Sequence, residues 1–431
     1  FVFPFASTFV SFVLVSFRFQ AIFAKKGDWE KREGGKYARL IGEPSNANAH
    51  KNQPRRETDM VEGTMRAAIA RKDPKDDAAS AAAAAAGGGG GGRGATTLSV
   101  SVEDVPMPRP DFIKEKECLV KVIRAGVCAT DLEILKGYMG FEGCLGHEFV
   151  GIVESSPPGY EHLIGKRVCA DINVACCNLQ FADLSASTRR FAKEGKEEEV
   201  LQCKVCNLDE KRDAVDMLRR NHCPNRTVLG ILGRPGCFSE YLTMPVRNLH
   251  VVQDCVTDAE ACFSEPLAAA LRIVEQQLLV QRGGEAEERQ KIAVLGDGKL
   301  GLLITAALTA TLSKDRQATL TKTTIFMLGR HNCKLELLKE MQRSVKGVVD
   351  LVLVNVKTDE GKRILQEEES GGGSCDIVVE ATGSPDGFQQ ACTLLKPRGK
   401  LVLKSTCAAG IEKGLNLASL VIDELFVVGS R

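Results

Sequence analysis

The sequence has almost no net charge, because 57 lysines and arginines are balanced by 56 aspartates and glutamates, which leaves a formal charge of +1. A chain without excess positive charge gives no reason to expect nucleic acid or an acidic surface as its partner. Histidine is also scarce, with six in 431 residues. The length exceeds what one hydrophobic core usually supports, so we expect two domains.

The first 64 residues lack the features of a folded domain. The chain begins with Phe1 rather than Met, and residues 1–24 are dense in Phe and Val with Arg18 as their only charge. A signal peptide would carry a basic region before its apolar run, and an isolated arginine is costly inside a bilayer. Residues 27–59 mix charges with Gly, Asn and Pro, which is typical of disorder. We expect a disordered or artefactual head over 1–64, and targeting by its apolar part stays open.

Short strand-like runs, broken by Gly and Pro, follow the head. They cover residues 65–70, 119–123, 149–153, 167–170 and 238–242. This pattern predicts a β-rich domain over 65–265. Two segments interrupt it, namely 72–95, which includes six consecutive glycines, and the polar stretch 178–202. We expect both to be flexible insertions.

One group of residues has the composition of a catalytic metal site. Cys128 lies in the segment Gly-Val-Cys-Ala-Thr-Asp, and His147 and Glu148 follow nineteen and twenty residues later. Thiolate, imidazole and carboxylate are ligands of catalytic zinc, which keeps one position open for water or substrate. The alternative is a core cysteine and a structural histidine. Glu265, just before a proline at an expected helix start, is a further candidate, although an acid there also simply favours the helix dipole.

The other cysteines divide into core residues and a second metal-like group. Cys118, Cys262 and Cys392 lie in apolar runs and are expected to be buried. The second group has ligand spacing and comprises Cys176, Cys177, Cys203, Cys206, His222 and Cys223. Four thiolates would form a closed structural zinc site, whereas a redox pair lacks the strand-then-helix context that it needs. Thiols held for a metal favour a reducing compartment, so we expect a cytoplasmic protein.

The second half contains a strand-turn-helix pattern. The apolar run 291–295 enters the turn Gly296-Asp-Gly298-Lys299-Leu300-Gly301, and apolar residues then continue at helical density. In dinucleotide-binding folds the first glycine makes a tight turn, the second lets the backbone approach a pyrophosphate, and the third lets helix pack on strand. The helix N-terminus offers free N–H groups to the phosphates. We therefore predict that these residues bind a dinucleotide.

The next strand, expected at 324–328, bears on the choice of dinucleotide. An acid at its end binds the ribose 2′-hydroxyl of NAD, whereas a nearby arginine accommodates the 2′-phosphate of NADP. Here Gly329 holds the acid position and Arg330 follows, which favours NADP, although a solvated turn arginine is the alternative. The interval from Gly301 to Gly329 exceeds the usual ~20 residues, and we expect 312–323 to be an extra loop.

Together these motifs resemble the zinc-dependent medium-chain alcohol dehydrogenases, in particular the branch of threonine, sorbitol and glucose dehydrogenases. The resemblance runs from about Thr97 to Arg431 and includes the segments 223–231, 265–267, 380–384 and 399–403. It implies an α/β protein with a GroES-like β-rich catalytic domain followed, over 266–431, by a Rossmann domain. It also implies hydride transfer between a secondary alcohol or polyol and NAD(P), and a homo-oligomer.

The resemblance assigns roles to single residues. Its catalytic zinc ligands are Cys128, His147, Glu148 and Glu265, and its structural zinc ligands are Cys176, Cys203, Cys206 and Cys223. Thr130 would pass on the substrate proton, Glu133 stands where many relatives carry a relay histidine, and Thr382 and Gly383 would lie on the nicotinamide side.

Three features depart from the family. The structural cysteines are spread out, so Cys177 or His222 is an alternative ligand; Glu133 replaces the histidine; and relatives continue beyond Arg431, which implies a truncated Rossmann domain. Two other functions stay open, namely a zinc-free quinone or enone reductase of the same superfamily and a non-catalytic nucleotide-binding protein.

Overall fold

The computed structural model describes residues 63–72, 98–112, 116–176, 221–279, 290–314, 323–345, 347, 349–370, 372–405 and 418–430. The chain divides into two compact units, one ending at Glu265 and the other beginning at Pro266. The expected head and insertions lie outside the described residues except at their margins, where Thr64 and Lys72 are the ends of strand β1. None of the described helices combines the length and the apolar composition needed to span a membrane.

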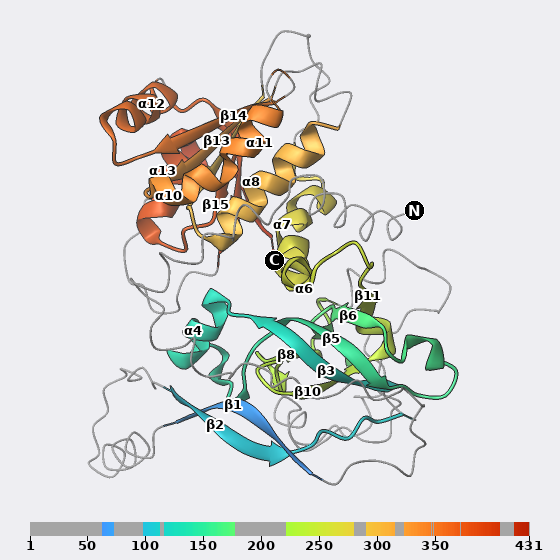
Figure 1. Ribbon diagram of the computed structural model, residues 1–431. Coiled ribbons are helices and arrows are strands. Elements are labelled where there is room, and N and C mark those ends of the chain that lie inside the picture. Colours follow the sequence, from blue (N-terminus) through green and yellow to red (C-terminus); the bar gives the residue numbers. More distant parts are fainter. Residues whose placement is uncertain are drawn as a thin grey trace, which may run out of the picture. The chain divides into compact units, whose positions relative to one another are not determined.

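The first unit contains a five-stranded antiparallel sheet with the order β10-β3-β5-β6-β11 (Figure 1). Its strands are β3 Glu117–Gly126, β5 Glu148–Ser155, β6 Arg167–Ala170, β10 Tyr241–Pro245 and β11 Leu249–Val251. The strands expected at 119–123, 149–153 and 167–170 are confirmed, but the one expected at 238–242 begins three residues later. Phe238 instead donates its N–H to the Leu145 carbonyl at 2.9 Å, and its ring lies against Gly146, where a Cβ would come within 2.4 Å of it.

Two three-stranded sheets complete the strands described for this unit. β1 Thr64–Lys72 lies between β2 Leu98–Pro106 and β4 Gly143–Cys144, and β8 Thr227–Leu229 lies between β7 Asn173–Val174 and β9 Gly233–Arg234. Buried and exposed residues alternate at the start of β1, as expected for a strand with one face on a core. The helices are α4 Ala129–Leu135, α6 Asp258–Ala261, η2 Tyr138–Gly140, η3 Glu161–Leu163 and η7 Val246–Asn248, while α7 Ser264–Glu275 crosses the division.

The second unit is a six-stranded parallel sheet with the order β14-β13-β12-β15-β16-β17. Its strands are β12 Lys291–Leu295, β13 Thr324–Gly329, β14 Asp350–Asn355, β15 Cys375–Glu380, β16 Leu395–Leu403 and β17 Phe426–Gly429. In chain order this is 3-2-1-4-5-6, the doubly wound arrangement of Rossmann domains. The described sheet contains all six strands of that order. The strand order reverses between β12 and β15, where such folds bind their ligands.

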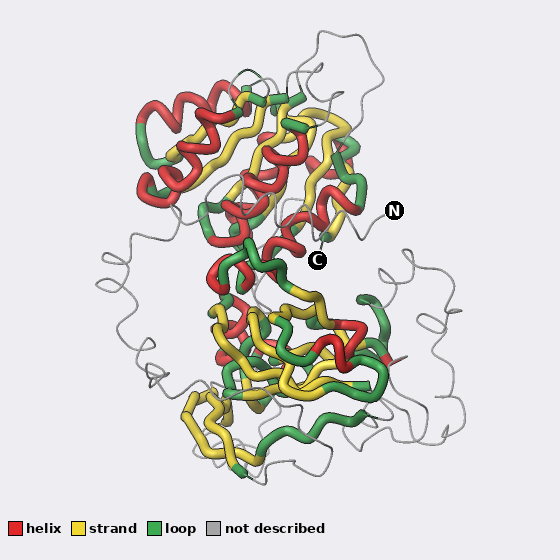
Figure 2. Tube along the Cα trace, turned by 45° about the vertical axis from the view of Figure 1, so that its right-hand side comes forward, coloured by secondary structure: helices red, strands yellow, loops and turns green. Residues whose placement is uncertain are grey.

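Helices pack along the strands of this sheet, as Figure 2 shows in red and yellow. They are α8 Lys299–Leu312, α10 Asn332–Leu335, α11 Lys339–Ser344, α12 Asp359–Glu369, α13 Pro385–Leu394, α14 Ala418–Ile422 and η8 Glu336–Leu338. Ser384 caps α13 by accepting the Gly387 N–H, and Pro385 suits the first turn because it has no N–H to satisfy.

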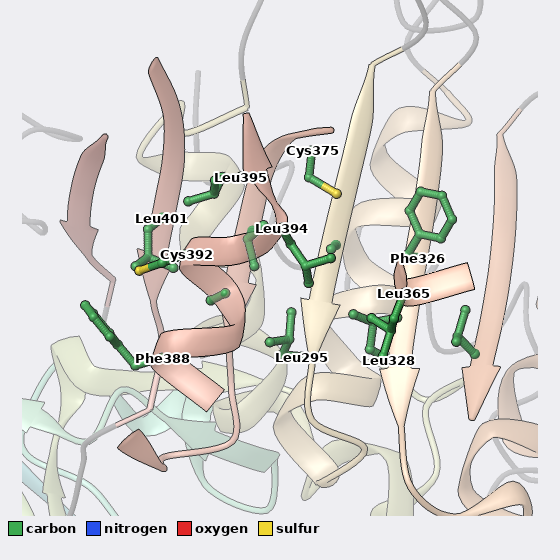
Figure 3. Close-up of a cluster of buried hydrophobic side chains, with 14 residues drawn as sticks. Leu295, Phe326, Leu328, Leu365, Cys375, Phe388, Cys392, Leu394, Leu395 and Leu401 are labelled. Atoms are coloured by element: carbon green, nitrogen blue, oxygen red, sulfur yellow. The ribbon is translucent and has the colours of Figure 1, made fainter. Parts of the chain in front are cut away.

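The apolar core of the second unit joins strands to α13. Leu295 and Leu328 come from neighbouring strands, and Phe388 and Cys392 come from α13 (Figure 3). Truncating a buried phenylalanine such as Phe388 to alanine costs about 3–5 kcal/mol. Cys118, Cys262 and Cys392 are all buried, which confirms their expected place in the core.

Candidate functional site

The first unit brings Cys128, His147 and Glu148 together. β3 ends at Gly126, directly opposite Glu148 at the start of β5, and Cys128 is the N-cap of α4. The ligand atoms of the three side chains lie within 4.8 Å of one another, and His147 and Glu148 are buried. Gly126 makes room for this arrangement, since a Cβ there would come within 2.5 Å of Glu148 Oε2.

Asp131, which the sequence analysis did not single out, holds this cluster in place. Its Oδ2 accepts the Cys128 N–H at 2.8 Å, and its Oδ1 lies 3.4 Å from His147 Nδ1. The Asp131 and His147 side chains are only 4% and 3% exposed. The available signal was the position of an acid three residues after an N-cap, from which a carboxylate reaches back to the cap N–H.

The surroundings of His147 favour positive charge. Burial alone would lower the pKa of His147, but the adjacent side chains of Asp131 and Cys128 and the charge of Glu265 raise the pKa to about 11. Cysteine, histidine and carboxylate are the donor set that zinc takes in proteins. A carboxylate bonded to a ligating histidine is the usual companion of such a metal. The residues present therefore fit a zinc ion.

The other residues predicted for this site lie on α4 and α7. Thr130 is two residues after Cys128, and its Oγ1 lies 3.6 Å from Cys128 Sγ. Glu133 accepts a hydrogen bond from Lys136 one turn along the helix, at 2.8 Å. Glu265 is in the first turn of α7. Among the described residues, Glu265 is outside the set of ligand atoms within 4.8 Å, and its charge acts on His147.

Two of the four predicted structural zinc ligands meet although they lie 47 residues apart in sequence. Cys176 Sγ and Cys223 Sγ are separated by 3.4 Å. Two thiolates on one tetrahedral zinc, with Zn–S bonds of about 2.3 Å, lie about 3.8 Å apart. Cys203, Cys206 and the alternative Cys177 lie outside the described residues, and His222 is exposed.

The glycine turn of the second unit has the geometry that its sequence predicts. Gly296 has φ +111°, and a Cβ on it would lie 2.8 Å from the Ala381 carbonyl oxygen. A Cβ on Gly301 would lie 1.8 Å from the Gly296 carbonyl oxygen, so only glycine lets the helix start this close to the turn. Gly298 is the N-cap of α8, and a Cβ there would meet nothing within 4 Å. Lys299 and Leu300 form the first turn of α8 and are half-buried.

Thr382 and Gly383 lie beside this turn, beyond the end of β15. The Ala381 N–H donates to the Leu295 carbonyl at 2.9 Å, which holds the ends of β15 and β12 together. Buried Glu380 accepts the N–H groups of Thr382 and Gly383 at 2.6 and 3.1 Å. The Glu380 carboxylate therefore fixes the loop at Thr382 and Gly383, which was predicted to lie on the nicotinamide side.

Asp297, in the turn after β12, is a second aspartate that sequence reasoning missed, and it contacts the residues that follow β13. Leu295 pairs with Leu328, so Gly296, which follows β12, and Gly329, which ends β13, lie at neighbouring strand ends. Asp297 Oδ2 accepts the N–H groups of Arg330 and His331, each at 2.7 Å, and lies 2.8 Å from His331 Nδ1. The only signal in the sequence was an acid between the first two glycines of the turn.

Comparisons with known proteins support the fold described for the two units. The model of the alcohol dehydrogenase GroES-like domain matches residues 114–254. L-threonine 3-dehydrogenase of Chromobacterium violaceum is 24% identical over 344 residues, covering 76% of this chain and 82% of its own. Sorbitol dehydrogenase of Halalkalibacterium halodurans is 24% identical over 334 residues, covering 77% and 80%. The fold resembles that of the RspB alcohol dehydrogenase of Escherichia coli CFT073 in complex with NADH, with a TM-score of 0.55, 21% identity and coverage of 86% and 84%.

Proposed function

Because this chain belongs to the zinc-type medium-chain alcohol dehydrogenase family, we propose that it transfers a hydride between a secondary alcohol or polyol and NAD or NADP. The observation that carries this proposal is the meeting of Cys128, His147 and Glu148 within 4.8 Å. That donor set leaves a coordination position for a substrate oxygen. The threonine and sorbitol dehydrogenases among its relatives support the alcohol class of the substrate.

In the first unit, Cys128, His147 and Glu148 would hold the catalytic zinc, with Glu265 as a further oxygen ligand or as the holder of its water. A zinc ion in this place supplies Lewis acidity, which lowers the pKa of a coordinated hydroxyl. The Thr130 hydroxyl, 3.6 Å from Cys128 Sγ, would take the substrate proton while passing on its own. Glu133 would accept that proton as the base of the relay and release it to solvent, with Lys136 donating to its carboxylate.

In the second unit, the glycine turn would hold the dinucleotide. Gly298 leaves open space at the start of α8, where the N–H groups of the first turn, those of Lys299, Leu300 and Gly301, favour an anion such as a pyrophosphate. Thr382 and Gly383 would contact the nicotinamide half. Binding and alignment are the tasks of the protein here, since the cofactor carries the hydride chemistry itself.

The remaining assignments are proposals of the same kind. The 3.4 Å approach of Cys176 to Cys223 supports a structural zinc that Cys203 and Cys206 would complete. We assign catalysis to residues 65–265 and cofactor binding to 266–431. We also propose a homo-oligomer, which the family resemblance implies, and a cytoplasmic location, which the expected metal-binding thiols favour.

The test is an alcohol and polyol screen with NAD and NADP in parallel, on protein whose zinc content has been measured. In Cys128→Ser we expect zinc content and activity to fall together, because the thiolate ligand is lost. Cys255→Ser is the matched control, since Cys255 is an exposed cysteine of the same unit, and it should keep both. Full activity in Cys128→Ser would contradict the assignment.

Two other outcomes would identify the alternatives. Quinone or enone reduction by metal-free protein would indicate the zinc-free reductase. Dinucleotide binding without turnover over the whole panel would indicate a non-catalytic nucleotide-binding protein.

A further inference from the structure

The end of β13 lacks an acid of its own, but a carboxylate from another strand end occupies the place. A Cβ on Gly329 would lie 2.7 Å from Asp297 Cβ and 3.0 Å from Asp297 Oδ2. The Asp297 side chain therefore fills the space that a side chain at position 329 would need. Gly329 is required because Asp297 is there.

We propose that Asp297 supplies the carboxylate that binds the adenosine ribose of the dinucleotide, and that it makes NAD the preferred cofactor in spite of Arg330. The proposal rests on the proposed function, because it concerns the cofactor of that reaction. It reverses the preference for NADP that Gly329 and Arg330 suggest in the sequence alone.

The hydrogen bonds of Asp297 leave one oxygen for a ligand. Oδ2 takes the amides of Arg330 and His331 and the His331 ring, and none of the hydrogen bonds described for Asp297 uses Oδ1. A ribose 2′-hydroxyl can donate to that oxygen, whereas a 2′-phosphate is mostly dianionic at neutral pH and is repelled by the like charge of the carboxylate. Burial opposes ionisation, but the bonds from His331 and from the two amides outweigh it and lower the pKa of Asp297.

The Arg330 guanidinium, whose positive charge would favour NADP, is less well ordered than the Asp297 carboxylate. The Arg330 side chain is exposed, and among the described residues its guanidinium makes no ion pair. An exposed guanidinium loses side-chain entropy when it is ordered on a phosphate, and water and salt screen its charge. The Asp297 side chain is only 9% exposed and is already fixed by its bonds. A pre-ordered carboxylate should therefore decide the preference.

The experiment measures dissociation constants of NADH and NADPH by calorimetry for the wild type, Asp297→Asn and Arg330→Ala. We expect the wild type to bind NADH about tenfold more tightly than NADPH, which corresponds to about 1.4 kcal/mol, and Asp297→Asn to lose that preference. Asparagine keeps an oxygen for the Arg330 and His331 amides, so the turn should persist. Arg330→Ala should keep the preference for NADH.

Glu367→Gln removes one negative charge from an exposed residue near the end of α12 and should leave the ratio of the two constants unchanged. Tighter binding of NADPH by the wild type, or an unchanged ratio in folded Asp297→Asn, would overturn the proposal. The wild-type ratio decides even where a variant fails to fold. NADH preference without alcohol turnover would uphold Asp297 while refuting the proposed function, and failure to bind either dinucleotide would refute both.

Discussion

Asp131 in the first unit and Asp297 in the second make nearly the same contacts in very different surroundings. Each accepts backbone N–H groups at a helix start or strand end and lies near a histidine ring. The partner of Asp131, His147, is 3% exposed, whereas the partner of Asp297, His331, is 45% exposed. Asp131 therefore shapes a closed cluster of side chains, and Asp297 presents an oxygen at the edge of a sheet.

The difference extends to how the two regions are built. The first site consists of side chains with metal-binding chemistry, which need exact donors but tolerate variation in the loops between them. The second consists of backbone at a turn, where the requirement is the absence of a side chain at Gly296 and Gly301. Substitutions that change a side-chain donor should therefore have the largest effects in the first region. Substitutions that add volume should have the largest effects in the second.

Asp131→Asn should give the largest effect and tests the closed cluster. The amide keeps the shape but removes the charge that faces His147, and loss of such a partner typically costs about 10–100-fold in metal affinity. Zinc affinity would be measured by competition with a chromophoric chelator, alongside thermal unfolding. Asp104→Asn, a change at an exposed position on β2, should match the wild type. Unchanged zinc affinity in Asp131→Asn would show that Asp131 serves only as a helix cap.

Gly301→Ala should come next and tests the backbone site. The new Cβ would lie 1.8 Å from the Gly296 carbonyl oxygen, so α8 or the turn has to move, and overpacking of this kind costs about 1–3 kcal/mol. We expect a lower midpoint in urea unfolding together with weaker NADH binding. A wild-type midpoint would mean that the turn yields easily and that the glycine is not needed for packing.

The sequence predicted most of this fold because its signals are local. β6 has the predicted bounds, β12 and its turn follow from the apolar run and the glycines, and Cys128 and His147 were recognised by residue type. Asp131 and Asp297 were missed because their roles depend on contacts across 16 and 34 residues, with His147 and His331. The same reason explains Phe238, which covers Gly146 instead of entering β10.

Gly298→Ala should have the smallest effect on stability and separates folding from function at the same turn. Gly298 has φ −74° and ψ 172°, which alanine adopts without strain, and nothing lies within 4 Å of the new Cβ. Stability should stay level or rise by up to about 0.5 kcal/mol, since alanine restricts the unfolded chain. No contact within the described protein requires glycine at position 298. We therefore expect that the glycine leaves room for the dinucleotide, and that NADH affinity falls about tenfold in the variant. Calorimetry beside urea unfolding measures both, and wild-type affinity would mean that the pyrophosphate does not approach this backbone.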